Sequence, residues 1–122
     1  PADYPTTHPL AKEYWENWAS YISLKIEGNA DTLGNGTHDL GLQYHLADTS
    51  ATADYVLELA QPISLTEDAT TTIPITVDLK AIMTTENSSL VDVKAKPRDH
   101  GKVPEFSKML MTNLKNAMEI QK

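Results

Sequence analysis

An alternation of apolar and polar residues in several short segments is the strongest constraint on the fold. Residues 21–27 alternate cleanly, with Ile22, Leu24 and Ile26 on one face and polar side chains on the other. Similar alternation recurs over residues 38–46, 55–59, 63–65, 71–79 and 90–93. A period of two residues is typical of a strand with one buried face. The sequence therefore predicts a mainly β domain with short antiparallel strands, most simply arranged as a β-sandwich.

The C-terminal part of the chain follows a helical period instead. Pro104 suits the first turn of a helix. Apolar residues then recur at helical spacing, at Phe106, Leu110, Leu114 and Ala117. The pattern predicts an amphipathic helix from Pro104 through Ile120, docked where it protects an exposed strand. The methionines beside this stripe are interpreted as core filler, because methionine at helical spacing usually packs.

Length and composition predict a single domain over residues 1–122. The chain is 40% hydrophobic, and no apolar run approaches the ~20 residues that span a bilayer. Strands this short give a thin core, and the sequence begins at Pro1 rather than at a methionine. We therefore expect an N-terminally truncated fragment or a processed product, whose missing strands precede Pro1 or come from another chain.

Charge and composition narrow the classes of function. The net charge is −7 and no basic cluster is present, which argues against nucleic acid as a partner. The lack of cysteine excludes disulfides, thiol catalysis and zinc–thiolate sites. The sequence contains neither a nucleophile elbow nor a glycine-rich phosphate loop. The spacing of the acidic residues alone does not exclude hydrolysis by a pair of carboxylates. The sequence thus favours a protein that is not an enzyme.

Histidines and tryptophans are the candidate functional residues. Residues 8–28 (HPLAKEYWENWASYISLKIEG) hold one histidine and both tryptophans, Trp15 and Trp18. All the histidines fall in or beside predicted loops and strand ends, at His8, His38, His45 and His100. Imidazole suits copper, zinc, iron and nickel. The residues alone leave two interpretations open, a metal site or ordinary loop histidines beside an aromatic packing surface.

Four blocks of the chain, in order, resemble the MbnP family. Residues 8–28 are similar to its His-Pro-Leu, Tyr-Trp and strand segment, and residues 40–51 (LGLQYHLADTSA) to its His-Leu strand. Residues 73–83 (IPITVDLKAIM) resemble its Val-Asp-Leu turn, and residues 104–120 resemble its closing helix, with Asn113 at the family's asparagine. The family often shows Trp-x-Trp, whereas here the two tryptophans are three residues apart. The family's N-terminal strands have no counterpart in this sequence.

The resemblance implies an exported copper-binding protein, located in the periplasm or at the cell surface as an extracellular protein. Relatives of this kind bind copper with histidines and a tryptophan oxidised to kynurenine. A dihaem peroxidase-like partner of the MbnH type is implied for that oxidation. By motif, His8 and His45 are the candidate copper ligands, with His100 as a third, and Trp15 is the candidate for oxidation.

A second class of function stays open from the sequence. The chain could be a non-catalytic structural or interaction protein that binds a partner through its aromatic loop or an open sheet edge. Self-association or strand donation from another chain would then complete the sheet.

Overall fold

The computed structural model describes residues 4–47, 54–59, 61–101 and 103–120. Its elements, in chain order, are the short 3₁₀ helices η1 (Pro9–Glu13) and η2 (Glu16–Trp18), the strands β1 (Tyr14–Trp15), β2 (Ser20–Tyr21), β3 (Leu24–Ala30), β4 (Leu40–Leu46), β5 (Ile75–Val77), β6 (Arg98–Asp99) and β7 (Met118–Ile120), and the helices α1 (Leu79–Ile82) and α2 (Pro104–Ala117).

The central sheet has the order β3-β4-β6. Strands β3 and β4 form an antiparallel hairpin whose register runs from Leu24 opposite Leu46 to Ala30 opposite Leu40. Strand β6 pairs with β4 in parallel. The alternation correctly predicted a strand in each of these segments, although β3 runs over residues 24–30 and not over residues 21–27.

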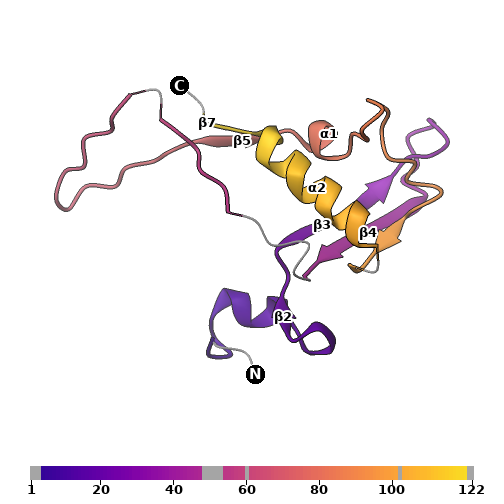
Figure 1. Ribbon diagram of the computed structural model, residues 1–122, viewed down its shortest axis with the longest axis horizontal. Helices are drawn as coiled ribbons and strands as arrows, with labels where there is room; N and C mark the ends of the chain where they lie inside the picture. The colour runs from indigo at the N-terminus through magenta and orange to yellow at the C-terminus, as the bar shows by residue number, and fades with distance from the viewer. Residues whose placement is uncertain (1–3, 48–53, 60, 102, 121–122) are drawn as a thin grey trace.

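Helix α2 packs against this sheet and closes the core (Figure 1). Its first residue is Pro104, as predicted, but it ends at Ala117 because Met118 adopts an extended backbone and starts β7. The core gathers buried apolar side chains from β4, α1 and α2, namely Leu46, Ile82, Leu110, Met111 and Ala117. None of the helices in the described ranges is long and apolar enough to cross a membrane.

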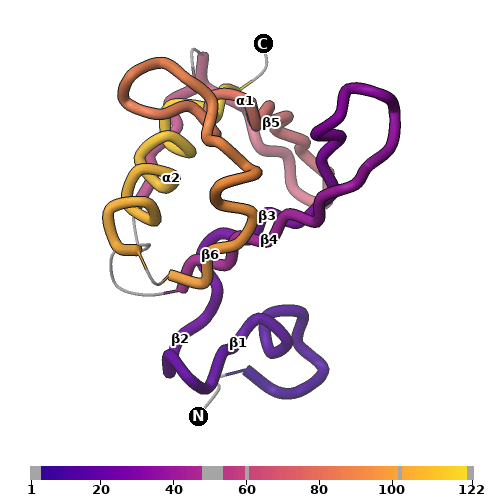
Figure 2. Tube along the Cα trace, turned by 90° about the vertical axis from the view of Figure 1, so that its right-hand side faces the viewer, coloured from indigo at the N-terminus to yellow at the C-terminus, as the bar shows by residue number. Residues whose placement is uncertain are grey.

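The N-terminal residues form a separate small hairpin. Strand β1 pairs with β2, with Tyr14 opposite Tyr21 and Trp15 opposite Ser20. Helix η2 makes the turn, and Ala19, the residue that follows it, has a φ of 48°, in the left-handed region. Figures 1 and 2 show this hairpin on the far side of the central sheet from α1. Its Trp15 contacts His45 of the central strand β4, on the opposite face from Leu46, which packs in the core with α2.

Several predicted strands do not form within the described residues. Residues 54–59, 61–65 and 90–93 carry no strand, and the segment predicted over 71–79 is reduced to β5, at residues 75–77. Alternation favours an extended chain, but a strand also needs a neighbour to complete its hydrogen-bond ladder. The described strands make three small sheets of two, three and two strands. The domain is consequently mixed α/β with a C-terminal helix, rather than mainly β.

Candidate functional site

The pairing of β4 with β6 brings two histidines together. These strands run in parallel, with Tyr44 beside Asp99, so the next residue on each, His45 and His100, also lie side by side. Their rings stack with centroids 5.0 Å apart and an interplanar angle of 5°. His45 is buried, with 8% of its surface exposed. Two of the three histidines predicted as metal ligands thus meet here.

Trp15 covers the histidine pair from the N-terminal hairpin. Its ring centroid lies 5.5 Å from that of His45 and 5.0 Å from that of His100. Trp18 packs on Trp15 at 4.4 Å and reaches the edge of His100 at 6.5 Å. Side chains alternate across a strand, which is why Trp15 faces the histidines while Tyr14 faces away. We call His45, His100, Trp15 and Trp18 the histidine cluster.

A hydrogen-bond chain orients both imidazoles. Nε2 of His45 lies 2.7 Å from Oε1 of Glu27. The Nε2 amide of Gln43 donates to the same carboxylate oxygen at 3.3 Å, and its Oε1 lies 3.3 Å from Nε2 of His100. The hydrogen bond from His45, followed by that from Gln43, holds the pKa of Glu27 below its usual value. Glu27 is therefore ionised at neutral pH.

The ionised carboxylate determines where the ring protons sit. A carboxylate only accepts, so Nε2 of His45 must carry the proton that it donates to Glu27. Since the Gln43 amide points its N–H group at Glu27, its oxygen accepts from Nε2 of His100. In the neutral form of each ring, the lone pair then lies on Nδ1. Metal-binding histidines commonly donate their other N–H to a carboxylate or a carbonyl in this way.

Nδ1 of His45 has no hydrogen-bond partner among the described residues, although it is buried. An unpaired buried polar atom costs free energy, which a ligand can recover. This atom is the strongest indication of a binding site in the cluster. No group of three or more His, Asp or Glu side chains within the described ranges could hold a metal ion. A metal here would therefore rely on the imidazole pair.

The remaining histidines lie elsewhere. His8 precedes η1, where its Nδ1 accepts a hydrogen bond from the Leu10 amide at 3.2 Å. Its ring stacks on Tyr4 with a centroid distance of 4.3 Å, and Tyr4 contacts Tyr21 on the other side of the hairpin. His38 is exposed and precedes β4. The structure thus brings His45, His100 and Trp15 together and leaves His8 in a separate aromatic group.

Comparisons with known proteins found no match: no family model, no curated protein and no solved structure matches this chain. The functional argument therefore depends on the site's own chemistry.

Sequence reasoning missed the contribution of Glu27 and Gln43. The period of two placed Gln43 and His45 on the same face of their strand, which was a usable signal for that contact. Glu27 faces Gln43 across the hairpin, two pairs along from the Lys25–His45 pair, and only the register reveals this arrangement.

Proposed function

We propose that this chain binds one copper ion through Nδ1 of His45 and Nδ1 of His100, beside Trp15. The observation that carries the proposal is the buried, unpartnered Nδ1 of His45, on a ring whose other nitrogen is tied to Glu27. A bound ion would supply the missing partner. Since the two rings now stack in parallel, they must turn out of that stack to share an ion.

Copper fits the donor set better than zinc. Protein zinc sites are almost always four-coordinate in structural sites, or keep three protein ligands in catalytic ones. The cluster supplies imidazole nitrogen, which suits copper, and no thiolate is available. Cu(I) carries one positive charge where Zn²⁺ carries two, so it also adds less charge to a site that is otherwise aromatic. Copper bound there would serve for capture or storage.

We also propose that the chain belongs to the MbnP family and is exported to the periplasm or cell surface. Additional strands would complete its sheets into an antiparallel β-sandwich. The four sequence blocks that resemble the family support this part of the proposal. Trp15 contacts both imidazoles, which supports it as the residue to be oxidised by a dihaem peroxidase-like partner. Conversion to kynurenine adds one oxygen atom and removes one carbon atom, so intact-mass spectrometry of the protein from its native source detects it.

Equilibrium dialysis against Cu(I), with a competing chelator, tests the copper site. The wild type should retain one equivalent, and the double variant His45→Ala/His100→Ala should retain none. The matched control, His8→Ala/His38→Ala, removes the same number of imidazoles outside the cluster and should bind like the wild type. Equal retention by the two double variants, with unchanged circular dichroism, would contradict the assignment.

A further inference from the structure

Residues 54–59 and 61–74 form an arm, of which residues 61–74 project from the body of the protein (Figure 1). At its base the arm is attached to the core, because Tyr55 packs there and its hydroxyl donates to the Met111 carbonyl at 2.6 Å. Every residue from 61 to 80 is exposed. The arm turns back at residues 66–69, where the Ala69 amide donates to the Thr66 carbonyl at 3.2 Å. That is the only backbone–backbone hydrogen bond of the arm among the described residues. Its extended chain therefore offers unpaired amides and carbonyls.

The composition of the arm is that of a strand. Its sequence alternates Ile, Val, Leu and Thr, which predicted strands over 55–59, 63–65 and 71–79. Within the described residues, β5 is the one strand that forms in these segments, and β7 is its one partner strand. A segment with strand pattern, extended backbone and no ladder is a template on which another strand can pair. Among the described residues, no neighbouring strand pairs with the arm.

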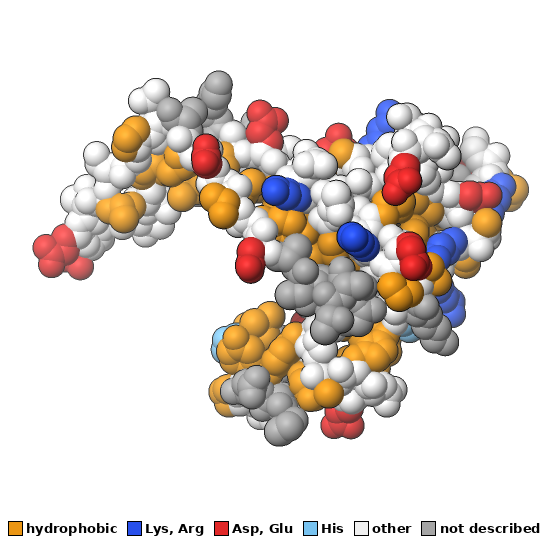
Figure 3. Space-filling view, in the orientation of Figure 1, with side chains coloured by type: hydrophobic (Ala, Val, Ile, Leu, Met, Phe, Trp, Pro, Cys, Tyr) orange, Lys and Arg blue, Asp and Glu red, His pale blue; other side chains and the backbone are white. Residues whose placement is uncertain are grey.

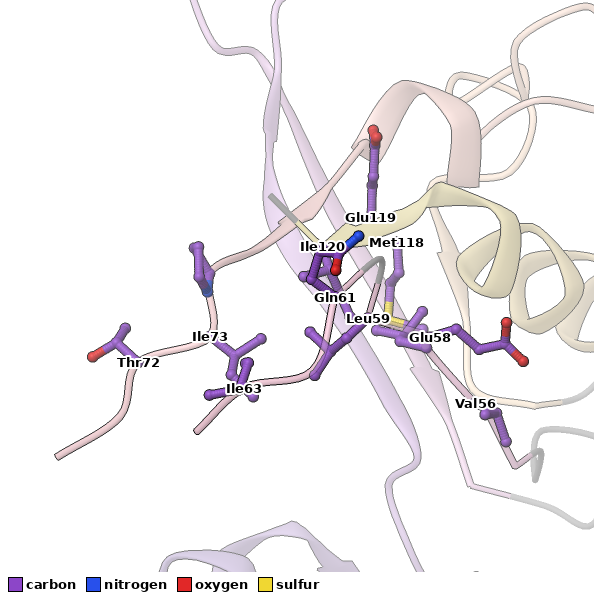
Figure 4. Close-up of a pocket in the computed structure, with 12 residues that line it drawn as sticks. Val56, Glu58, Leu59, Gln61, Ile63, Thr72, Ile73, Met118, Glu119 and Ile120 are labelled. Atoms are coloured by element: carbon purple, nitrogen blue, oxygen red, sulfur yellow. The ribbon is translucent and has the colours of Figure 1, made fainter. Parts of the chain in front are cut away.

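An apolar groove of about 830 Å³ opens between the arm and β7. In Figure 4, the side chains of Leu59, Ile63 and Ile73 point toward one another into this groove, while Thr72 points away. These apolar residues are partly exposed to solvent: Ile73 is 45% and Leu59 40% exposed. Burial of such side chains at the alternate positions of an added strand would supply affinity and register.

The arm is also strongly acidic, which limits what can cover it. Residues 54–74 contain four acidic residues and no lysine or arginine, with the acids at Asp54, Glu58, Glu67 and Asp68. Figure 3 shows apolar side chains along the projection and acidic ones at its end. A second copy would bring an identical acidic arm, and like charges across an interface repel. The complementary occupant is cationic.

We infer that the arm binds an extended apolar segment of a different protein, flanked by lysine or arginine, which pairs with the arm as an added strand. The apolar side chains of the segment fill the groove, and its basic flanks meet Glu58, Glu67 and Asp68. This surface lies on different elements from the histidine cluster. Binding of the segment to the arm is therefore independent of copper.

A synthetic peptide tests this surface in the full chain. The probe is a fluorescein-labelled peptide in which valine and threonine alternate between paired lysines at both ends. Fluorescence anisotropy should give saturable binding with a Kd of about 100 µM or tighter. Peptides with glutamate in place of lysine, or with proline at the centre, should bind at least about tenfold more weakly, because they lose the charge match or an amide donor.

Variants of the protein locate the binding. The double variant Ile63→Ser/Ile73→Ser should bind the lysine-flanked peptide about tenfold more weakly. Leu33→Ser is the matched control, since Leu33 is 66% exposed on the β3–β4 turn, away from the arm, and it should change nothing. The inference is overturned if the peptide fails to saturate by about 1 mM, or if the double variant and the control bind alike. It is equally overturned if sedimentation shows a dimer that Ile63→Ser/Ile73→Ser dissociates, because a second copy then occupies the groove.

Discussion

At the scale of single residues, Glu27 has more influence than its exposure suggests. Its carboxylate accepts from His45 and from Gln43, and through Gln43 it also sets the orientation of His100. One carboxylate thereby fixes the tautomer of both imidazoles. Partners of this kind typically contribute tenfold or more to metal affinity in known sites, although they never touch the metal.

Glu27→Gln tests this positioning role. The amide keeps the size of the side chain but removes the charge that holds the proton on Nε2 of His45. Copper affinity should fall by about tenfold or more, measured by competition with a chromophoric Cu(I) chelator. Glu58→Gln, an exposed neutralisation on the arm, should bind copper like the wild type. Equal affinities in the two variants would show that Glu27 does not orient the site.

Asp31 holds the turn between β3 and β4 in a pH-dependent way. Its Oδ1 accepts from the amides of Leu33 and Gly34 at 3.1 and 2.7 Å, and its Oδ2 accepts from the amide of Gly36 at 2.6 Å. These hydrogen bonds keep the pKa of Asp31 below its usual value, and the bond from the Gly36 amide contributes most. Because the folded pKa is the lower one, the stabilisation is present above the unfolded value of about 3.9 and disappears as the pH falls through the folded value.

Asp31→Asn should therefore lower the urea midpoint at pH 7, and the difference from the wild type should shrink as the pH is taken below about 4. Asp54→Asn, an exposed substitution on the arm, serves as the control at each pH. A deficit in Asp31→Asn that is the same at pH 7 and at the acidic end would exclude the carboxylate as its origin.

At the scale of elements, α2 could be predicted and the arm could not. The helical period begins at Pro104 and places Leu110 in the core, because a helix satisfies its own backbone and needs only one apolar face. A strand depends on its neighbour, so the same alternation gave β3 and β4, which pair, and left residues 61–65 extended without a ladder. The C-terminal turn of the predicted helix became β7 for the same reason, since β5 offered it a partner.

Asn113 fastens α2 to the end of α1. Its side-chain amide donates to the carbonyls of Ile82 and Thr84, at 2.9 and 2.6 Å. Asn113→Ala leaves both carbonyls without this partner and should lower the free energy of unfolding by about 1–3 kcal/mol, measured by urea denaturation. Asn116→Ala, on the exposed face of the same helix, should cost about 0.5 kcal/mol or less. Similar losses in both variants would mean that the two hydrogen bonds carry no net stabilisation.

At the scale of the whole molecule, the histidine cluster is assembled from segments far apart in the chain. Trp15 comes from the N-terminal hairpin, His45 from β4, and His100 from the end of β6. Residue types and the resemblance pointed to His45, His100 and Trp15 as candidates. The short parallel pairing of β4 with β6 has no pattern in the sequence, because two residues are too few to show a period. Because of this pairing, His100 and not His8 lies beside His45.

The most direct test of the copper site is long-range ¹H–¹⁵N correlation of the histidine rings during titration with Cu(I), which is diamagnetic. Before copper is added, His45 and His100 should show a protonated Nε2 and an unprotonated Nδ1. One equivalent of Cu(I) should shift the Nδ1 signals of both rings and leave those of His8 and His38 in place. A shift at His8 or His38 instead, or no shift at His45 and His100, would contradict the proposed site.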